Sequence, residues 1–382
     1  MPYFVVKKEP VAKQISFEDL FSGADISLLA TKDTKDTVTY EVEHISEKML
    51  KKTNFKAMFE SVKSFVEKYK DFIEAEDKHQ FYRTFKIPKH SGGLRTINAP
   101  TEEFKVALNE LKDILETKFF FTYHTSAFAY VKGRCTLDAV RRHRSNESRW
   151  FWKTDLKSFF PSSTPEYVFK MLYKTYPLSE YIHADDEYLG YKDTFEKALS
   201  ICFLDGGLPQ GTPTSPMITN QIMIPIDHDI MKMCREFSPR LCVTRYADDI
   251  QISSKYSFLW SEVQINIERI LKKFEAPYTI NKDKTHYGSS AGRNWILGVM
   301  YNKDGNITVG HEKKKVAKAS VFQFMKNFTE GTPWNLEDTQ HLQGVLSYYN
   351  MVEPSFVDKL CKDYSKKFNL DVKRCIKEII SG

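Results

Sequence analysis

The 382-residue chain lacks any apolar run near the roughly 18 residues that a membrane-spanning helix needs. Its first ten residues, MPYFVVKKEP, also lack the apolar core of a signal peptide. Among the six cysteines, none form a Cys-x-x-Cys pair, and no set of Cys and His residues has the spacing of zinc ligands. Six scattered cysteines in a chain of this length indicate reduced, mostly buried thiols. These absences predict a cytoplasmic protein that has no membrane partner.

The chain also lacks a strong net charge, because 56 Lys and Arg residues against 50 Asp and Glu residues leave only +6. A charge of this size permits a polyanionic partner without requiring one. The basic residues are concentrated between Thr117 and Lys174, where 11 Lys or Arg and four acidic residues give a net charge of +7. The rest of the chain therefore has a net charge of −1. With 41% hydrophobic and 14% aromatic residues, the chain can bury the cores of two or three packed lobes, which excludes wholesale disorder.

Hydrophobic spacing along the chain predicts a mixture of helices and strands. Residues 1 to about 45 show weak periodicity, and we interpret them as an irregular extension. A Ser-Gly-Gly turn signal lies at the centre of a β-hairpin predicted over 81–100. Ser215 fits the N-cap, and Pro216 the first residue, of a helix predicted over 217–234. The other predicted elements are helices over 44–76, 101–118, 258–274 and from about 311 onward, and strands over 149–160, 241–254, 278–280 and 295–301.

An adjacent pair of acids, Asp248 and Asp249, lies between two short strands predicted over 241–254. On its own, such a pair is common in solvated turns. Here the apolar strand-forming residues on both sides place the pair at a hairpin tip, where two carboxylates repel each other unless a cation neutralises them. Magnesium, which binds a few carboxylates while water and phosphate complete its shell, would provide that cation.

A third carboxylate, Asp155, ends RWFWKTD (149–155), the first part of the strand predicted over 149–160. An acid at a strand end can also simply cap a turn. If Asp155 and Asp248 lie on neighbouring strands, their carboxylates can bridge two metal ions about 3.5–4 Å apart. Such a pair of ions supports in-line phosphoryl or nucleotidyl transfer.

The loop LPQGTPTSP (208–216) precedes the helix predicted over 217–234. Its Gln210 and Gly211 let the backbone approach a substrate while its amides face a phosphate or a base. A connector rich in Pro and Gly, with no binding role, is the alternative.

In this order, five segments resemble the motifs of reverse transcriptases, particularly bacterial ones. They are FKIPKHSGGLRTINAP (85–100), KTDLKSFFP (153–161), LPQGTPTSP (208–216), YADD (246–249) and WILG (295–298). The resemblance covers about residues 80–300, and HLQGVLSYYN (341–350) is weakly similar to the family's thumb. It implies an α+β right-hand polymerase fold with fingers, a palm made of an antiparallel sheet backed by helices, and a helical thumb. The implied domains are an N-terminal extension (1–45), fingers (46–148), a palm with a fingers insertion near 162–205 (149–300), and a thumb (301–382).

The resemblance implies two magnesium ions, which manganese can replace, held by Asp155 and Asp248 with Asp249 completing the acidic cluster. Lys284 matches a lysine that protonates the departing pyrophosphate, with an ordinary surface lysine as the alternative. Phe160 matches the steric gate that excludes a ribose 2′-hydroxyl, which implies incorporation of deoxynucleotides. The same ring could instead fill a core.

Four further residues match positions that contact the incoming nucleotide. Gln210 and Gly211 match residues that line it, and Lys89 and Arg95 match basic fingers residues on its triphosphate. A solvated hairpin face is the alternative for the two basic residues.

The basic segment 126–150 resembles the strip that precedes the first catalytic strand in this family. Its Arg134, Arg141, Arg142 and Arg144 are implied to contact template phosphates, with a solvated helix face as the alternative. Gly298 matches the primer-grip hairpin between palm and thumb. Lysines of the C-terminal helices would lie along the duplex.

The length of the chain favours a polymerase hand without further domains, because only 84 residues follow Gly298. Short bacterial enzymes of this kind belong to retrons or to other anti-phage defence systems. The implied partners are an RNA template such as a dedicated non-coding RNA, a DNA primer or product, deoxynucleoside triphosphates, and an effector or toxin protein.

Several readings of the sequence stay open. Retrons usually carry NAxxH and VTG where this chain has DAVRRH (138–143) and WILG (295–298), so a divergent defence enzyme is an alternative to a retron enzyme. Template-independent or protein-primed DNA synthesis is another. Synthesis of RNA is disfavoured by Phe160, and a catalytically inactive RNA-binding scaffold is disfavoured by the presence of all three aspartates.

Overall fold

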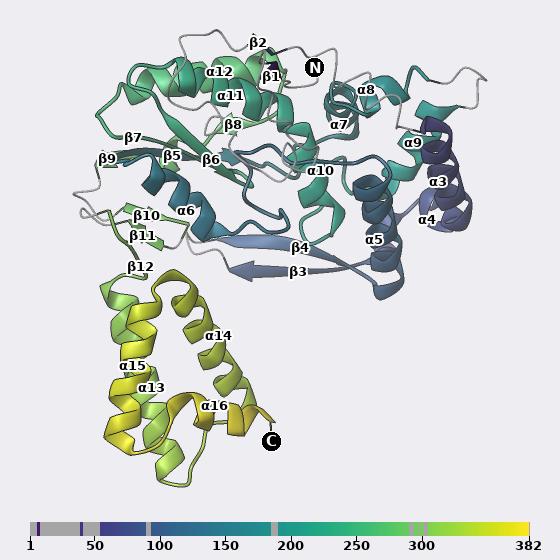
Figure 1. Ribbon diagram of the computed structural model, residues 1–382. Helices are drawn as coiled ribbons and strands as arrows, with labels where there is room; N and C mark the ends of the chain where they lie inside the picture. Colours follow the sequence, from purple (N-terminus) through teal and green to yellow (C-terminus); the bar gives the residue numbers. More distant parts are fainter. Residues whose placement is uncertain are drawn as a thin grey trace. The chain divides into compact units, whose positions relative to one another are not determined.

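The computed structural model describes residues 54–88, 93–184, 190–289, 294–297, 299–301 and 305–381, and the strands β1 (Val6–Lys7) and β2 (Thr39–Tyr40), which pair antiparallel (Figure 1). The chain divides into two compact units. The first comprises Met1–Arg134, Lys153–Gln251 and Leu259–Thr285, and the second comprises Cys135–Trp152, Ile252–Phe258 and His286–Gly382. The division into extension, fingers, palm and thumb stays a prediction.

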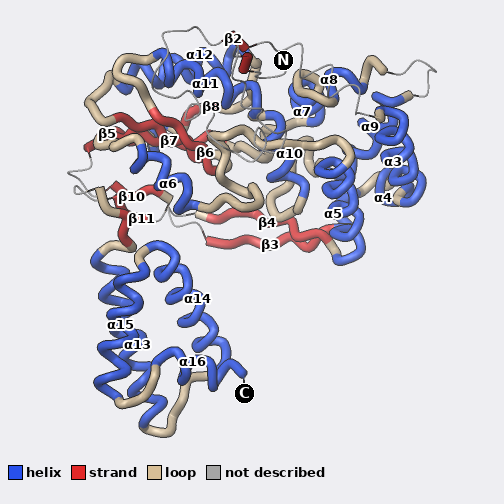
Figure 2. Tube along the Cα trace, in the orientation of Figure 1, coloured by secondary structure: helices blue, strands red, loops and turns tan. Residues whose placement is uncertain are grey.

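A five-stranded sheet carries the predicted catalytic segments, and its strands are red in Figure 2. In spatial order they are β6 (Cys242–Tyr246), β7 (Asp249–Ser254), β5 (Trp150–Lys157) and β8 (Thr279–Ile280), and β9 (His286–Ser289) also pairs with β5. β5 and β8 run antiparallel, with Leu156 opposite Ile280. Most of β5 is buried, as its aromatic and apolar residues predict for a central strand. The α+β class and the strands predicted over 149–160, 241–254 and 278–280 are therefore confirmed, whereas β9 was not predicted.

The predicted hairpin over 81–100 is present as β3 (Tyr82–Pro88) and β4 (Leu94–Pro100). The two strands pair antiparallel, from Tyr82 opposite Pro100 to Pro88 opposite Leu94. The turn 89–92 lies outside the described residues. The side chains of β3 after Tyr82 are exposed, so this strand offers a surface rather than a core.

Helices complete the first unit. The buried residues of α5 (Glu102–Thr117) recur at helical spacing, which confirms the helix predicted over 101–118. Phe59 of α3 stacks on Tyr191 of α9 with ring centroids 4.5 Å apart. α11 packs on β6 and on α12. The remaining bounds are α3 (Phe55–Lys68), α4 (Lys70–Glu74), η2 (Lys78–Phe81), α7 (Pro165–Leu172), α8 (Leu178–Tyr181), α9 (Tyr191–Leu199), η3 (Ser200–Cys202), α10 (Thr214–Ile222), α11 (Ile224–Glu236), α12 (Trp260–Lys273) and η4 (Lys282–Lys284).

The prediction of a single helix over 217–234 was wrong in two respects: where the helix begins, and that it is unbroken. Helix α10 begins earlier, with Pro213 at the N-cap position, so Ser215 and Pro216 lie inside its first turn. The segment then breaks into α10 and α11. Pro225 lies in the first turn of α11, and because proline has no N–H it cannot continue the hydrogen-bond ladder of the preceding helix.

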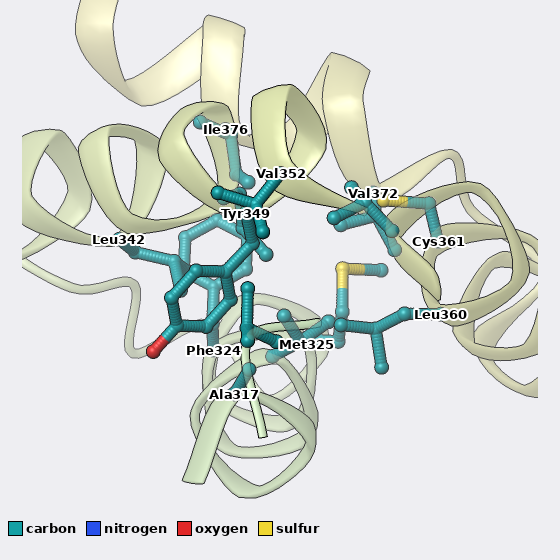
Figure 3. Close-up of a cluster of buried hydrophobic side chains, with 14 of the residues drawn as sticks. Ala317, Phe324, Met325, Leu342, Tyr349, Val352, Leu360, Cys361, Val372 and Ile376 are labelled. Carbon is teal, nitrogen blue, oxygen red and sulfur yellow. The ribbon is translucent and has the colours of Figure 1, made fainter. Parts of the chain in front are cut away.

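The second unit is mainly helical, as predicted from about residue 311 onward. Figure 3 shows labelled side chains of its C-terminal helices pointing into a shared core. Phe324 is fully buried there, and its ring meets that of Trp334 edge-on, with ring centroids 5.6 Å apart. The strand predicted over 295–301 is a hairpin of β10 and β11. The bounds are α6 (Thr136–Ser145), β10 (Asn294–Ile296), β11 (Val299–Tyr301), β12 (Ile307–Thr308), α13 (His311–Thr329), α14 (Leu336–Val352), α15 (Pro354–Phe368) and α16 (Val372–Ser381).

All six cysteines lie within the described residues and carry free thiols, four of them buried, as predicted. In the same part of the chain, no helix is both long and apolar enough to cross a membrane.

Candidate active site

The adjacent aspartates lie at the turn between β6 and β7. Ala247, the first residue of this turn, has φ +57°, a left-handed conformation that residues other than glycine rarely adopt. Such strain persists only where the surrounding structure maintains it. Here Nη1 of Arg245 donates a hydrogen bond to the Ala247 carbonyl oxygen at 3.0 Å. The turn that carries Asp248 and Asp249 is therefore fixed from inside the protein.

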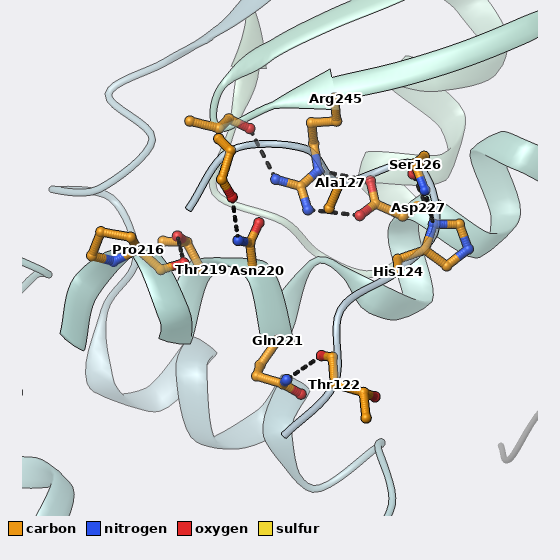
Figure 4. Close-up of polar contacts among 12 residues, drawn as sticks. Thr122, His124, Ser126, Ala127, Pro216, Thr219, Asn220, Gln221, Asp227 and Arg245 are labelled. Carbon is orange, nitrogen blue, oxygen red and sulfur yellow. Dashed lines mark hydrogen bonds and ion pairs between the residues drawn. The ribbon is translucent and has the colours of Figure 1, made fainter. Parts of the chain in front are cut away.

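Arg245 is itself held by a buried ion pair. Its Nε and Nη2 donate hydrogen bonds to the two carboxylate oxygens of Asp227 on α11, at 2.8 and 2.7 Å (Figure 4). The two side chains are only 1% and 2% exposed. Sequence reasoning missed both residues. The sequence feature that could have revealed them is an arginine inside an otherwise apolar strand, because a buried charge at such a position needs a buried partner of opposite charge.

The chain segment before Arg134 runs alongside β6. The N–H of Phe128 donates to the Arg245 carbonyl oxygen at 2.9 Å, and the N–H of Arg245 donates to the Ser126 carbonyl oxygen at 2.7 Å. From α10, the side-chain amide of Asn220 donates to the Ala129 carbonyl oxygen at 2.9 Å. The catalytic turn is thus anchored both to a helix and to this segment.

Asp155 reaches the same corner from β5. The N–H of the next residue, Leu156, donates to the Asp248 carbonyl oxygen at 3.0 Å. Asp248 lies in the turn before β7, the strand next to β5, so the two aspartates are neighbours, which was the condition for a shared pair of metal ions. Asp155 is 8% exposed. Its Oδ2 accepts a hydrogen bond from Asn281 Nδ2 at 3.1 Å and lies 3.4 Å from Lys284 Nζ. The structure therefore brings Asp155, Asp248 and Lys284 together.

The carboxyl groups of Asp248 and Asp249 resist ionisation. Burial raises the pKa of Asp248, and the charge of Asp155 adds to the increase, while Arg95 and Lys284 oppose it. Limited hydration of its carboxyl group, followed by repulsion from Asp248 and Asp155, raises the pKa of Asp249 to about 6, although the residue as a whole is exposed. A cation bound between these groups would relieve the repulsion.

The donors suit magnesium, although they do not form a closed cage. Within the described chain, no three His, Cys, Asp or Glu side chains converge closely enough to hold an ion. Magnesium usually keeps several waters and takes one or two protein carboxylates together with substrate phosphates. Asp155 and Asp248 at neighbouring strand ends match that requirement.

Replacement of Asp249 by asparagine is expected to stabilise the ion-free protein at neutral pH. Because the folded-state pKa of about 6 lies above the ordinary value of 3.8, the ionised group disfavours folding as the pH rises through this interval. Asparagine cannot ionise, so the melting temperature in EDTA should increase by about 2 °C at pH 7.5. The increase should disappear as the pH falls towards 4. Thermal unfolding across this pH range measures the effect. An Asp249→Asn variant that is less stable than the unchanged chain at pH 7.5 would contradict the inference that burial and charge repulsion at Asp249 destabilise the fold.

Phe160 is half-buried in the turn after β5, whereas its neighbour Phe159 occupies the core at 2% exposure. This division disfavours a purely structural role for Phe160. The Phe160 carbonyl oxygen accepts a hydrogen bond from the N–H of Leu208 at 3.1 Å. The turn is therefore joined to the loop that contains Gln210 and Gly211.

That loop also lies directly against β4. The N–H of Asn98 donates to the Gln210 carbonyl oxygen at 2.8 Å. Gly211 has φ +114°, and a Cβ there would lie 2.9 Å from Cγ2 of Ile97 and 3.0 Å from the Asn98 carbonyl oxygen. Only glycine fits this approach. Since β4 also carries Arg95, and Leu208 joins this loop to Phe160, four of the predicted nucleotide-binding residues belong to one connected structure.

The predicted template-binding arginines differ in their surroundings. Nη1 of Arg134 donates to the carbonyl oxygens of His124 and Ala127 at 2.8 and 2.7 Å, so this guanidinium supports its own segment. In the second unit, α6 carries the other three: Arg141 pairs with Asp138 at 3.2 Å, Arg142 is half-buried, and Arg144 is exposed. Lys89 and Gly298 lie outside the described residues. Binding of nucleic acid by this set stays a prediction.

An aspartate near the end of one strand, a second aspartate in the turn before the neighbouring strand and a lysine beside the first form an arrangement suited to polymerase-type nucleotidyl transfer. The model of the family "Reverse transcriptase (RNA-dependent DNA polymerase)" matches residues 87–317, more than half of the chain. The chain therefore belongs to the reverse transcriptase family and is an RNA-directed DNA polymerase.

Individual proteins support a bacterial relationship. The Retron Ec83 reverse transcriptase of Escherichia coli is 29% identical over 303 residues, which cover 77% of this chain and 90% of that protein. The Retron Ec73 reverse transcriptase of the same species is 28% identical over 284 residues, which cover 73% and 85%. Among solved structures, apo telomerase from Candida tropicalis aligns with a TM-score of 0.45 at 14% identity, over 80% of this chain and 63% of the telomerase chain, less than two thirds. The chain is thus related to the retron reverse transcriptases.

Proposed function

We propose that the chain copies RNA into DNA with two magnesium ions, replaceable by manganese, that are held by Asp155 and Asp248 while Asp249 completes the acidic cluster. The observation that carries this proposal is the hydrogen bond from the Leu156 N–H to the Asp248 carbonyl oxygen, which brings the two strand ends side by side. When bound, such ions activate a primer 3′-hydroxyl and stabilise the leaving oxygens of a nucleoside triphosphate. The protein's own task is to hold the carboxylates in place.

The other residues of the site have roles that follow from their positions. Lys284 Nζ, on a side chain that is 54% exposed, can donate a proton to departing pyrophosphate. Phe160 would exclude a ribose 2′-hydroxyl. Gln210 and Gly211 would line the nucleotide. Arg95, exposed on β4, and Lys89 would bind its triphosphate.

The nucleic acid would be bound through its backbone. Arg141, Arg142 and Arg144 on α6 would contact template phosphates, with Arg134 shaping the segment before them. Gly298 would belong to the primer grip. Similarity to proteins named as retron reverse transcriptases supports a retron-type activity. We extend the proposal to a dedicated non-coding RNA as template and to a role in anti-phage defence with an effector or toxin partner, in the cytoplasm.

The proposal can be tested on the purified full-length chain. We expect extension of a DNA primer on an RNA template with deoxynucleotides and magnesium, and its complete loss in EDTA. Sequencing the nucleic acids that copurify should return one abundant RNA and DNA complementary to part of it. Absence of RNA-templated extension would contradict the activity, and a random mixture of cellular RNAs would contradict the dedicated template.

A further inference from the structure

Asn281, which precedes η4, contacts Asp155 at two points. Its N–H donates to the Asp155 carbonyl oxygen at 2.9 Å, and its Nδ2 donates to the Asp155 carboxylate oxygen Oδ2 at 3.1 Å. The adjacent pair of Leu156 and Ile280 in the β5–β8 register sets this alignment. Backbone and side chain therefore act on the same aspartate.

The chemistry of the two groups fixes the orientation of the amide. An ionised carboxylate only accepts hydrogen bonds, so the amide must present Nδ2 to Asp155 and direct Oδ1 elsewhere. Oδ1 of Asn281 is buried and has no hydrogen-bond partner among the described residues. An unpartnered buried oxygen costs free energy, which indicates that the orientation is determined by Asp155 rather than by the rest of the surroundings.

Both side-chain donors that reach the Asp155 carboxylate, one amide and one ammonium group, contact the same oxygen. Oδ2 receives the Asn281 amide and lies 3.4 Å from Lys284 Nζ. The other oxygen, Oδ1, accepts no hydrogen bond from any residue of the described chain. The carboxylate is thus restrained at Oδ2, while Oδ1 has no hydrogen bond from the described residues.

The backbone of Asn281 is restrained in turn. The Asn281 carbonyl oxygen accepts hydrogen bonds from the Lys284 N–H at 3.1 Å and from Thr285 Oγ1 at 2.9 Å. The Thr285 hydroxyl is also paired with Thr154 Oγ1 at 2.8 Å, on the strand that carries Asp155. A closed set of contacts therefore connects the asparagine, the lysine and the catalytic strand.

We propose that Asn281 is a positioning residue that restrains Oδ2 of Asp155 and so keeps Oδ1 directed at a divalent cation. The inference rests on the proposed function, because it assigns the cation to Asp155. Residues that orient metal ligands in this way typically change metal affinity or activity by about 10–100-fold when they are replaced.

The test compares Asn281→Ala and Asn281→Leu with the unchanged chain. Leucine has the same branching and the same number of side-chain heavy atoms as asparagine, is somewhat larger, and donates no hydrogen bond, so it separates packing from orientation. Binding of manganese alone is measured by electron paramagnetic resonance, and magnesium dependence by primer extension. We expect the half-saturating manganese concentration to rise about tenfold in both variants. kcat should fall at fixed magnesium while KM for the deoxynucleotide stays unchanged.

Asn54→Ala is the matched control, because Asn54 caps α3 through a bond from the Ala57 N–H at 2.9 Å in the same unit. It should lower the melting temperature without changing manganese binding. Unchanged manganese affinity in both Asn281 variants, or full recovery by leucine, would overturn the inference. So would failure of the unchanged chain to bind manganese saturably. If that chain binds manganese but does not extend primers on RNA, the proposed function fails and the inference stands.

Discussion

Replacement of both Asp248 and Asp249 by alanine is expected to abolish magnesium-dependent incorporation of deoxynucleotides while the fold stays intact. The change removes two of the three aspartates to which the proposed function assigns the metal ions. Preorganised charged groups at a reacting centre are commonly worth 10²–10³ each, so we expect a loss of at least about a thousandfold in kcat. Primer extension measures the loss, and circular dichroism with thermal unfolding checks the fold.

The fold should survive because the two carboxylates oppose folding rather than support it. Burial raises the pKa values of both acids, with added repulsion from Asp155 on Asp248 and from Asp248 and Asp155 on Asp249. Alanine at both positions removes these unfavourable charges. The matched control is Glu262→Ala plus Glu268→Ala, two exposed acids of α12 in the same unit, which should leave kcat unchanged. Undiminished synthesis by the Asp248 and Asp249 double variant would show that the catalytic site lies elsewhere.

Replacement of Phe160 by alanine is expected to relax discrimination against ribonucleotides. The ring is half-buried, and its backbone is joined to the loop that carries Gln210 and Gly211, so truncation opens space beside the proposed nucleotide. Removal of a steric barrier of this size should lower the ratio of kcat/KM for deoxynucleotides over ribonucleotides by about 100-fold. Competing single-nucleotide incorporation measures this ratio.

Phe159→Leu is the control for this experiment, because Phe159 is the adjacent ring and lies in the core. It should lower the melting temperature through lost packing and leave the sugar ratio unchanged. An unchanged ratio in Phe160→Ala would place the gate at another residue.

Features set by local sequence could be predicted before the structure was available. The hairpin over 81–100 and the turn carrying Asp248 follow from alternating apolar residues around turn signals. Placement of Asp155 beside Asp248 required one further assumption, that the two strands are neighbours, and the sheet confirms it.

Features that depend on contacts between distant segments could not be predicted in this way. Asp227 and Arg245 belong to different elements, and only the fold shows that they share two hydrogen bonds. Contact of Arg134 with template phosphate was predicted from resemblance to the family's basic strip, yet the folded segment supplies two carbonyl oxygens to its guanidinium. Local patterning reports exposure and periodicity, but it does not report which buried donor meets which acceptor.

The buried pair of Arg245 and Asp227 has a consequence for engineering of this chain: its effect on stability can be separated from its effect on the catalytic turn only if both residues are replaced together. A single substitution at either position leaves an unpaired buried charge and costs about 3–5 kcal/mol, so such variants are lost before activity can be judged. Joint replacement by apolar residues of similar volume is often neutral for stability in comparable pairs. A doubly substituted chain would keep its core and lose the hydrogen bond that restrains the Ala247 carbonyl oxygen. These two positions therefore form one mutational unit, and random libraries that change one residue at a time will not reach it.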